Sequence, residues 1–109
     1  MANKFINAQF SLTTTNPVAV YTCPAETVAM IKSIQSYNSS SGTVSVTASI
    51  TDNSASATYN FSKRTLGAGT SSDLLTGVKV FEENDILNLT GSYTGVITGT
   101  VAILEQDRK

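Results

Sequence analysis

The chain has 109 residues, which predicts a single domain over residues 1–109, and its formal net charge is −1 with only 14% charged residues. It contains no histidine, no tryptophan and one cysteine, whereas acid–base, nucleophilic and metal chemistry draws mainly on histidine, cysteine and grouped carboxylates. This inventory predicts a non-enzymatic protein with no catalytic, cofactor-binding or metal-binding residues.

Strict alternation of apolar and polar residues, which is typical of a half-buried β-strand, marks residues 6–12, 43–51 and 56–62. The side chains expected to face the core are Ile6, Ala8, Phe10, Leu12, Val44, Val46, Ala48, Ile50, Ala57, Tyr59 and Phe61. The alternate positions are mostly Ser, Thr and Asn, and thirty residues of the chain are Ser or Thr. The surface is therefore expected to be neutral and rich in hydroxyl groups.

Further segments have strand composition with weaker alternation, at residues 18–22, 28–37, 74–81, 85–93 and 96–105. In the second of these, Ile31 and Ile34 fall out of phase, which predicts a bulge or burial on both faces. Gly77 interrupts the third and predicts two short pieces around a turn. The last segment is apolar on both faces, which predicts a central strand or one covered by a neighbouring subunit.

Turn-forming residues separate these segments at 38–42, 52–54, 66–70, 83–85 and 93–95. No segment shows helical periodicity over more than two turns. About eight strands thus recur at a spacing of roughly ten residues. The spacing predicts an all-β protein, a single antiparallel β-sandwich of jelly-roll type.

We expect the two ends of the chain to behave differently. Residues 1–12 form an amphipathic strand that could fold back as a sandwich edge or reach out to a neighbour, and the alternation favours folding back. Residues 106–109 are polar and charged with no apolar anchor, so they are expected to be mobile or to contact a partner only through their charges.

Two loops resemble ligand sites only weakly. Glu82, Glu83 and Asp85 could supply oxygen ligands to Ca²⁺, but a polar turn with Asn84 in a left-handed conformation explains them better. Residues 67–69 contain two glycines, as phosphate-binding loops do, yet no Lys followed by Ser or Thr comes after them. A flexible loop is favoured there.

The aromatic and sulfur side chains offer equally weak indications of a ligand site. Tyrosine faces can stack on sugar rings, and the candidates are Tyr21, Tyr37, Tyr59 and Tyr93. Ordinary core or interface positions are favoured for them, because no tryptophan is present. Cys23 has no partner for an intramolecular disulfide and is predicted to be a small buried side chain beside Pro24.

The basic residues appear scattered along the chain: Lys4, Lys32, Lys63, Arg64, Lys79, Arg108 and Lys109. Nucleic-acid binding needs such residues gathered on one surface, so no nucleic-acid partner is expected. No apolar run approaches the length of a signal peptide core or a membrane span, so no membrane partner is expected either.

A pattern of ordered stretches covers most of the chain between residues 5 and 104. The stretches are Val20–Ala25, Ala29–Gln35 closing on Asn38, Thr51–Tyr59, Gly67–Leu75 and Val80–Ile86. In this order they resemble a group of small β-sandwich virion structural proteins of tailed bacteriophages, of the type found in phages of marine bacteria and cyanobacteria. This chain has Asn84 where that group has a glycine, and asparagine accepts the same backbone conformation.

The resemblance implies a non-enzymatic phage virion protein and brings no catalytic or binding residues with it. We expect a capsid decoration (cement) protein that stabilises the head shell. The alternatives are a neck or tail accessory protein and then a carbohydrate-binding module of a host-recognition device. The expected partners are further copies of the chain, with a trimer favoured over a dimer, and the major capsid protein or other virion proteins. The protein would be located in the virion, assembled in the host cytoplasm.

Overall fold

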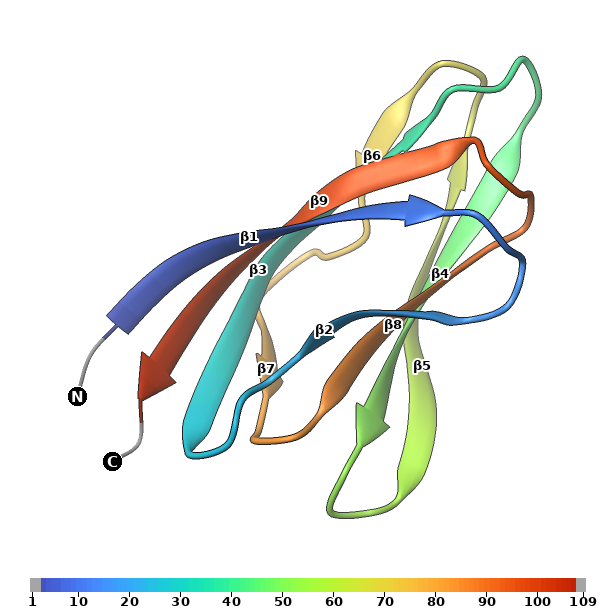
Figure 1. Cartoon of the computed structure of the whole chain (residues 1–109). Helices are drawn as coiled ribbons and strands as arrows, with labels where there is room; N and C mark the ends of the chain where they lie inside the picture. The colour runs from blue at the N-terminus through green and yellow to red at the C-terminus, as the bar shows by residue number, and fades with distance from the viewer. Residues whose placement is uncertain (1–2, 108–109) are drawn as a thin grey trace.

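A computed structural model describes residues 3–107, which form nine β-strands joined by turns and loops (Figure 1). The strands are β1 (Asn3–Leu12), β2 (Val18–Thr22), β3 (Thr27–Asn38), β4 (Val44–Asp52), β5 (Ala57–Leu66), β6 (Ser71–Asp73), β7 (Lys79–Phe81), β8 (Ile86–Gly91) and β9 (Ile97–Asp107). The three segments with strict alternation are all strands, namely β1, β4 and β5. Residues 3–107 include no helix capable of spanning a bilayer.

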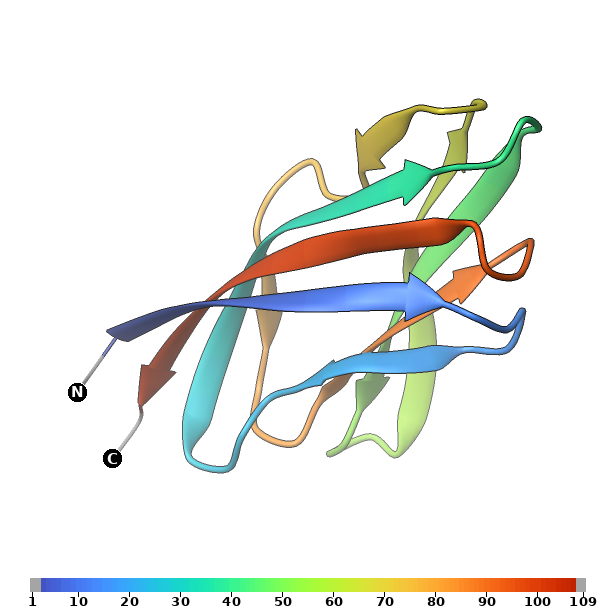
Figure 2. The ribbon, with the colours of Figure 1, turned by 45° about the horizontal axis from the view of Figure 1, so that its top comes forward.

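The strands form two antiparallel sheets that pack against each other as a sandwich (Figures 1 and 2). In sheet A the order is β1, β9, β3, and both β6 and β7 pair with the far side of β3. In sheet B the order is β2, β8, β4, β5. The predicted all-β sandwich is confirmed. All but the first residue of the apolar segment at residues 96–105 belong to β9, which is a central strand, one of the two predicted alternatives.

The strand pairing is that of one long hairpin rolled up on itself. β1 pairs with β9, β2 with β8, β3 with β6 and β7, and β4 with β5. Successive pairs belong alternately to sheet A and sheet B. This is the jelly-roll arrangement, with one of its eight strand positions divided into two short strands. The described chain therefore has nine strands where the sequence predicted about eight.

The jelly-roll position that is divided into β6 and β7 differs in detail from the sequence prediction. Two short pieces were expected around Gly77, but only β7 lies there, and β6 occupies residues 71–73, between the turn predicted at 66–70 and the strand segment predicted at 74–81. The division has a visible cause at Asp73. Its carboxylate Oδ1 accepts hydrogen bonds from the backbone N–H groups of Ile34 (3.0 Å) and Leu75 (2.9 Å). Because the side chain takes the N–H of Ile34, pairing with β3 stops at Asp73 and resumes at β7.

The core lies between the sheets and is built from alternate residues of both. Its largest fully buried side chains are Phe81, Leu12, Ile31, Ile34, Leu66, Leu74, Leu87, Leu89, Ile97, Ile103, Val46 and Val101. The predicted bulge in β3 is present, because the register with β9 shifts between Ile31 and Ser33. The shift turns both Ile31 and Ile34 into the core. Tyr59 was expected to face the core but is 55% exposed, since β5 is an edge strand.

Phe10 and Gly99 pack closely at the interior face of sheet A. The two residues are directly opposite in the register of β1 and β9. A Cβ atom at Gly99 would lie 2.6 Å from Cζ of Phe10 and 1.9 Å from the carbonyl oxygen of Gln35. Only glycine leaves room for the Phe10 ring at this point of the central strand.

Asn38 closes one end of the sandwich and is fully buried. Its Nδ2 donates to the carbonyl oxygens of Gly42 (2.7 Å), Leu66 (3.1 Å) and Gly67 (3.1 Å). Its Oδ1 accepts from the backbone N–H of Ser40 (2.9 Å). One amide group therefore holds the β3–β4 turn and the end of β5 together, and satisfies the buried carbonyl group of Leu66.

The first strand folds back into sheet A as predicted. β1 pairs with β9 from Asn3 opposite Gln106 to Leu12 opposite Ile97. At the other end of the chain, the expected mobility of residues 106–109 is wrong for Gln106 and Asp107. Both belong to β9 and pair with β3, because the strand continues past its apolar part. Arg108 and Lys109 lie outside the described residues.

Candidate functional site

A row of apolar side chains crosses the outer face of sheet A. The register places Phe5 of β1 opposite Leu104 of β9. Leu104 lies opposite Met30 of β3, and Met30 lies opposite Val80 of β7. Side chains opposite each other on one face of a sheet are within contact distance, so these four residues form one continuous apolar row. Phe5 is 76% exposed and Val80 is 55% exposed.

The remainder of this face is nearly free of charge. The other outward residues of β1, β9 and β3 are Asn3, Asn7, Gln9, Ser11, Thr98, Thr100, Ala102, Gln106, Val28, Ser33, Gln35 and Tyr37. Lys32 lies at the β3 bulge and has no register partner in β9. Asp73 is at the β6 edge, where its carboxylate accepts backbone hydrogen bonds. Aromatic and Met side chains with few charges are typical of the centre of a protein–protein interface.

The outer face of sheet B is different, because short polar side chains cover it. Ser45, Thr47, Ser49 and Thr51 of β4 face outward with Asn88 and Thr90 of β8. Some of these groups bond to each other: Asn88 Nδ2 donates to Thr51 Oγ1 (2.8 Å), and Thr51 Oγ1 lies 3.0 Å from Thr58 Oγ1. The hydroxyl-rich surface predicted from the sequence is thus the outer face of sheet B, whereas sheet A carries the apolar row.

The long edge strand β5 carries features that oppose pairing with another strand. The register with β4 shifts between Ala48 and Ser49, which leaves Phe61 as an extra residue in β5. Lys63 and Arg64 follow after one further residue, Ser62. Bulges and basic side chains on an edge strand discourage edge-to-edge association. We therefore take the face of sheet A, and not this edge, as the candidate interaction surface.

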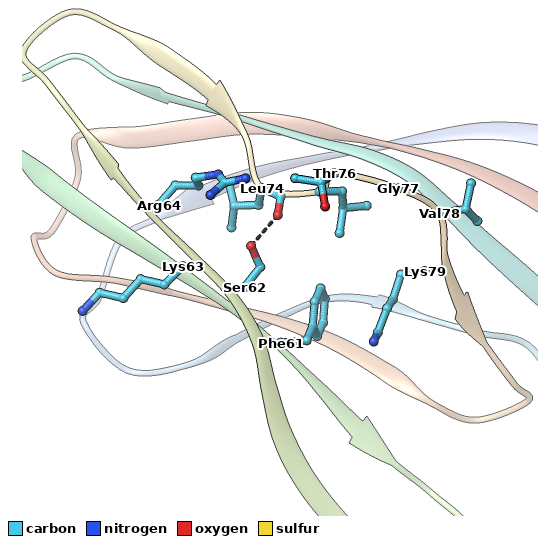
Figure 3. Close-up of a pocket in the computed structure, with 10 residues that line it drawn as sticks. Phe61, Ser62, Lys63, Arg64, Leu74, Thr76, Gly77, Val78 and Lys79 are labelled. Carbon is cyan, nitrogen blue, oxygen red and sulfur yellow. Dashed lines mark hydrogen bonds between the residues drawn. The ribbon is translucent and has the colours of Figure 1, made fainter.

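A pocket of about 500 Å³ opens between β5 and the β6–β7 connection (Figure 3). Lys63, Arg64 and Lys79 line it, so three of the basic residues that appear scattered in the sequence share one region. Each is directed differently. Lys63 extends away from the pocket (Figure 3), Arg64 Nε lies 3.4 Å from the carbonyl oxygen of Asp73, and Lys79 Nζ lies 5.0 Å from the ring centre of Phe61.

The acidic turn that was weighed as a calcium site is held together by Asp85, which is buried. Its carboxylate accepts hydrogen bonds from the backbone N–H groups of Asn53 (3.0 Å) and Glu82 (2.9 Å). Glu83 accepts from the backbone N–H of Glu26 (2.7 Å). The carboxylates thus tie three loops together, which agrees with the favoured turn. Asn84 has the predicted left-handed conformation, with φ of 68°.

The tyrosines do not lie together on one element. Tyr21 is buried, whereas Tyr37 is in β3, Tyr59 is in β5 and Tyr93 is in the β8–β9 loop, all three exposed. The sugar-stacking hypothesis required them on a common surface. Tyr21 is a core residue, in agreement with the favoured interpretation of ordinary core or interface positions.

Tyr21, Cys23 and Glu105 form a buried polar group between the sheets, which the sequence did not reveal. The Tyr21 hydroxyl donates to the Glu105 carboxylate, and Cys23 Sγ lies 3.4 Å from the carbonyl oxygen of Thr27. Burial raises the pKa of the Cys23 thiol to about 11, and the nearby Glu105 carboxylate adds to the shift. The thiol is therefore neutral at physiological pH, and the predicted burial of Cys23 is confirmed.

Comparison with known proteins gives similarity in fold and not in sequence. No protein-family model matches the chain, and no curated protein sequence does. Among solved structures, a chain in the acidic stable capsid of Helicobacter pylori bacteriophage KHP30 matches with a TM-score of 0.62 at 12% identity, over 100% of this chain and 90% of that one.

Two further matches have other functions. A pilus protein of Bacillus endospore appendages matches with a TM-score of 0.56 at 8% identity, over 95% of this chain and 84% of that one. The CBM22-1–GH10 modules of Clostridium thermocellum xylanase 10B, complexed with xylohexaose, match with a TM-score of 0.51 at 13% identity, over 85% of this chain and 19% of that one. The chain thus has a jelly-roll fold that also occurs in a phage capsid and in pili.

Proposed function

We propose that the protein is a non-enzymatic structural component of a phage virion, and specifically a decoration (cement) protein bound to the head shell. The observation that carries the proposal is the fold match to the KHP30 capsid chain, which spans this whole chain and 90% of the other. The two proteins therefore agree in size as well as in strand arrangement. The order of sequence stretches that resembles small phage virion proteins supports the same role.

The mechanism would be burial of surface between neighbouring shell subunits. A decoration protein strengthens a shell by contacting two subunits at once, so it needs two usable surfaces on one rigid body. The sandwich has them. The outer face of sheet A offers apolar contacts, and the outer face of sheet B offers hydroxyl groups for hydrogen bonds to the major capsid protein. Both faces carry few charges, so copies packed side by side repel each other little.

The position in the particle separates decoration from the alternative, a neck or tail accessory protein. A cryo-EM reconstruction of particles of the phage that encodes the chain is the direct experiment. Density for this jelly roll repeated over the head shell supports the proposal. Density confined to the neck or tail replaces decoration by the accessory role, and purified particles that lack the protein altogether refute a virion role.

A carbohydrate-binding role is the second candidate, because a part of the xylanase chain, 19% of its length in a structure complexed with xylohexaose, has a similar fold. The separated tyrosines speak against it. Screening the purified protein on a glycan array distinguishes the two, since a binding module retains a defined glycan and a cement protein does not. Retention that Tyr37→Ala, Tyr59→Ala or Tyr93→Ala abolishes would favour the carbohydrate role.

A further inference from the structure

We infer that the outer face of sheet A is a self-association surface, on which the apolar row (Phe5, Leu104, Met30 and Val80) packs against the same row of a second copy. The inference deepens the proposed function by naming one partner. Only the role of this contact in the particle rests on the proposed function, and the self-association itself does not.

The first argument is exposure. Phe5 and Val80 are more than half exposed at the two ends of the row, with Leu104 and Met30 half-buried between them. These residues come from four strands that the register aligns, so the row is a property of the folded sheet. Single exposed apolar residues are common on soluble proteins, but a continuous row on one face marks an interaction site.

The second argument identifies the occupant. The outward residues of β1, β9 and β3 include no acidic side chain, and the one basic residue of β3 is Lys32 at the bulge. A charged partner would find no complementary charges there, and an anionic membrane would find no basic rim. The face carries one basic residue, Lys32, and one acidic residue, Asp73 at the β6 edge, so a second copy of the same face meets little net repulsion and the face is compatible with itself.

The third argument is that the described chain presents no other comparable apolar surface. The remaining large apolar side chains exposed outside this face and the loop before β7 are Tyr59 and Tyr93, each on a different element. The outer face of sheet B is hydroxyl-rich. Within residues 3–107, the best match for the row is therefore the row of another copy, which gives a two-fold contact.

The available area is sufficient. Three strands (β1, β9 and β3) about 4.8 Å apart and about ten residues long, at about 3.4 Å per residue, cover roughly 490 Å² per copy in projection, and the short strands β6 and β7 add about 100 Å². Protruding side chains add to this value. Stable protein interfaces bury about 600 to 1,000 Å² per partner, so the whole face corresponds to an interface at the small end of that range. A two-fold contact predicts a dimer, whereas the sequence favoured a trimer, and the measured mass separates these outcomes.

The experiment is sedimentation velocity of the full chain across about 1 to 100 µM, a range that brackets micromolar affinity. The wild type is expected to approach twice the 11.5 kDa chain mass. The double variant Phe5→Lys/Val80→Lys should weaken association at least tenfold. Tyr59→Lys is the matched control, because it also replaces an exposed aromatic residue on an edge strand, and it should behave as the wild type.

Circular dichroism checks that each variant is folded. If the double variant does not fold, the single variant Val80→Lys takes its place in the sedimentation experiment. A monomeric wild type, a trimer, or a folded row variant that dimerises like the wild type would overturn the inference. Failure of the proposed function is a separate result: a protein absent from particles can still dimerise, and a monomer can still be found on the head shell.

Discussion

The hydroxyl of Tyr21 in β2 donates a hydrogen bond to the carboxylate of Glu105 in β9, which joins sheet B to sheet A inside the sandwich. Both residues are buried. Burial raises the pKa of the Tyr21 hydroxyl, and the hydrogen bond and negative charge of Glu105 raise it further. Tyr21 is therefore the proton donor over the whole physiological range, and Glu105 has a polar partner in an apolar environment.

Removing this donor should destabilise the fold. Tyr21→Phe leaves the Glu105 carboxylate without the phenol, and an unpaired buried acceptor costs about 1 to 3 kcal/mol of unfolding free energy. Urea denaturation followed by circular dichroism measures the loss. Tyr37→Phe removes the same atom from an exposed tyrosine and should change stability by less than about 0.5 kcal/mol. Equal effects of the two variants would contradict a stabilising role for the buried bond.

Stability should fall in alkaline solution. Cys23 has its pKa raised from 9.0 to about 11 on folding, so its contribution is complete below pH 9 and is lost as the pH rises through 11. Tyr21, with its pKa raised above 10, acts in the same direction above pH 10. Between about pH 8 and about pH 10.5 the unfolding free energy should drop by about 2 kcal/mol through Cys23 alone.

The variant Cys23→Ala isolates that contribution. It should assemble normally and lose about 1 kcal/mol near neutral pH through altered packing, while its pH dependence becomes shallower than that of the wild type. Parallel urea titrations of both proteins at the two pH values provide the measurement. If the unfolding free energy of both proteins fell equally between the two pH values, the thiol would have the same pKa in the folded and the unfolded state.

Two serines should respond in opposite directions to the same substitution. Ser36 is fully buried and its hydroxyl has no hydrogen-bond partner among residues 3–107, so Ser36→Ala should stabilise by about 1 kcal/mol. The Ser62 hydroxyl donates to the carbonyl oxygen of Leu74, so Ser62→Ala should destabilise by a similar amount. Thermal unfolding of both variants is the measurement. A loss of stability in Ser36→Ala would mean that the hydroxyl has a partner.

Gly99 and Gly77 provide a matched pair for close packing. Gly99→Ala places a methyl group against Phe10 and the backbone of Gln35, and should destabilise by more than about 2 kcal/mol or prevent folding. Gly77 has open space around its Cα, so Gly77→Ala should be nearly neutral. The urea concentrations at the unfolding midpoints of the two variants compare their stabilities. A well-folded Gly99→Ala protein of wild-type stability would contradict the described contact between β1 and β9.

Deletion of residues 1–12 should unfold the subunit, because β1 supplies buried Phe10 and Leu12 and pairs along β9. The loss of near-ultraviolet circular dichroism and of a cooperative melt would show it. A stable, folded subunit that no longer assembles would instead assign these residues to an arm.

The sequence predicted the fold well where local pattern determines it. Alternation located β1, β4 and β5, and the phase slip at Ile31 and Ile34 revealed the β3 bulge. The sequence did not predict the end of β6. That strand ends where the Asp73 carboxylate accepts a hydrogen bond from the backbone N–H of Ile34, 39 positions away in the chain. Such a bond leaves no local pattern.

The candidate surface was visible only in part. The two apolar faces of the last strand predicted a central strand or one covered by a neighbouring subunit, and Leu104 lies on that strand. Phe5, Met30 and Val80 gave no comparable signal, because each becomes part of the row only through the register of a different strand pair. The grouping of Lys63 and Arg64 with Lys79 was missed for the same reason.

The central place of β9 in sheet A also determines when the protein can fold. During synthesis, every other described strand emerges from the ribosome before β9 does. Until it arrives, β1 and β3 have no strand between them, and Glu105 is absent from the interior. Nascent chains that stop short of β9 therefore lack the middle of one sheet and expose the apolar interior of the other. Formation of the sandwich thus has to wait for β9, and only chains that include this strand present the apolar row.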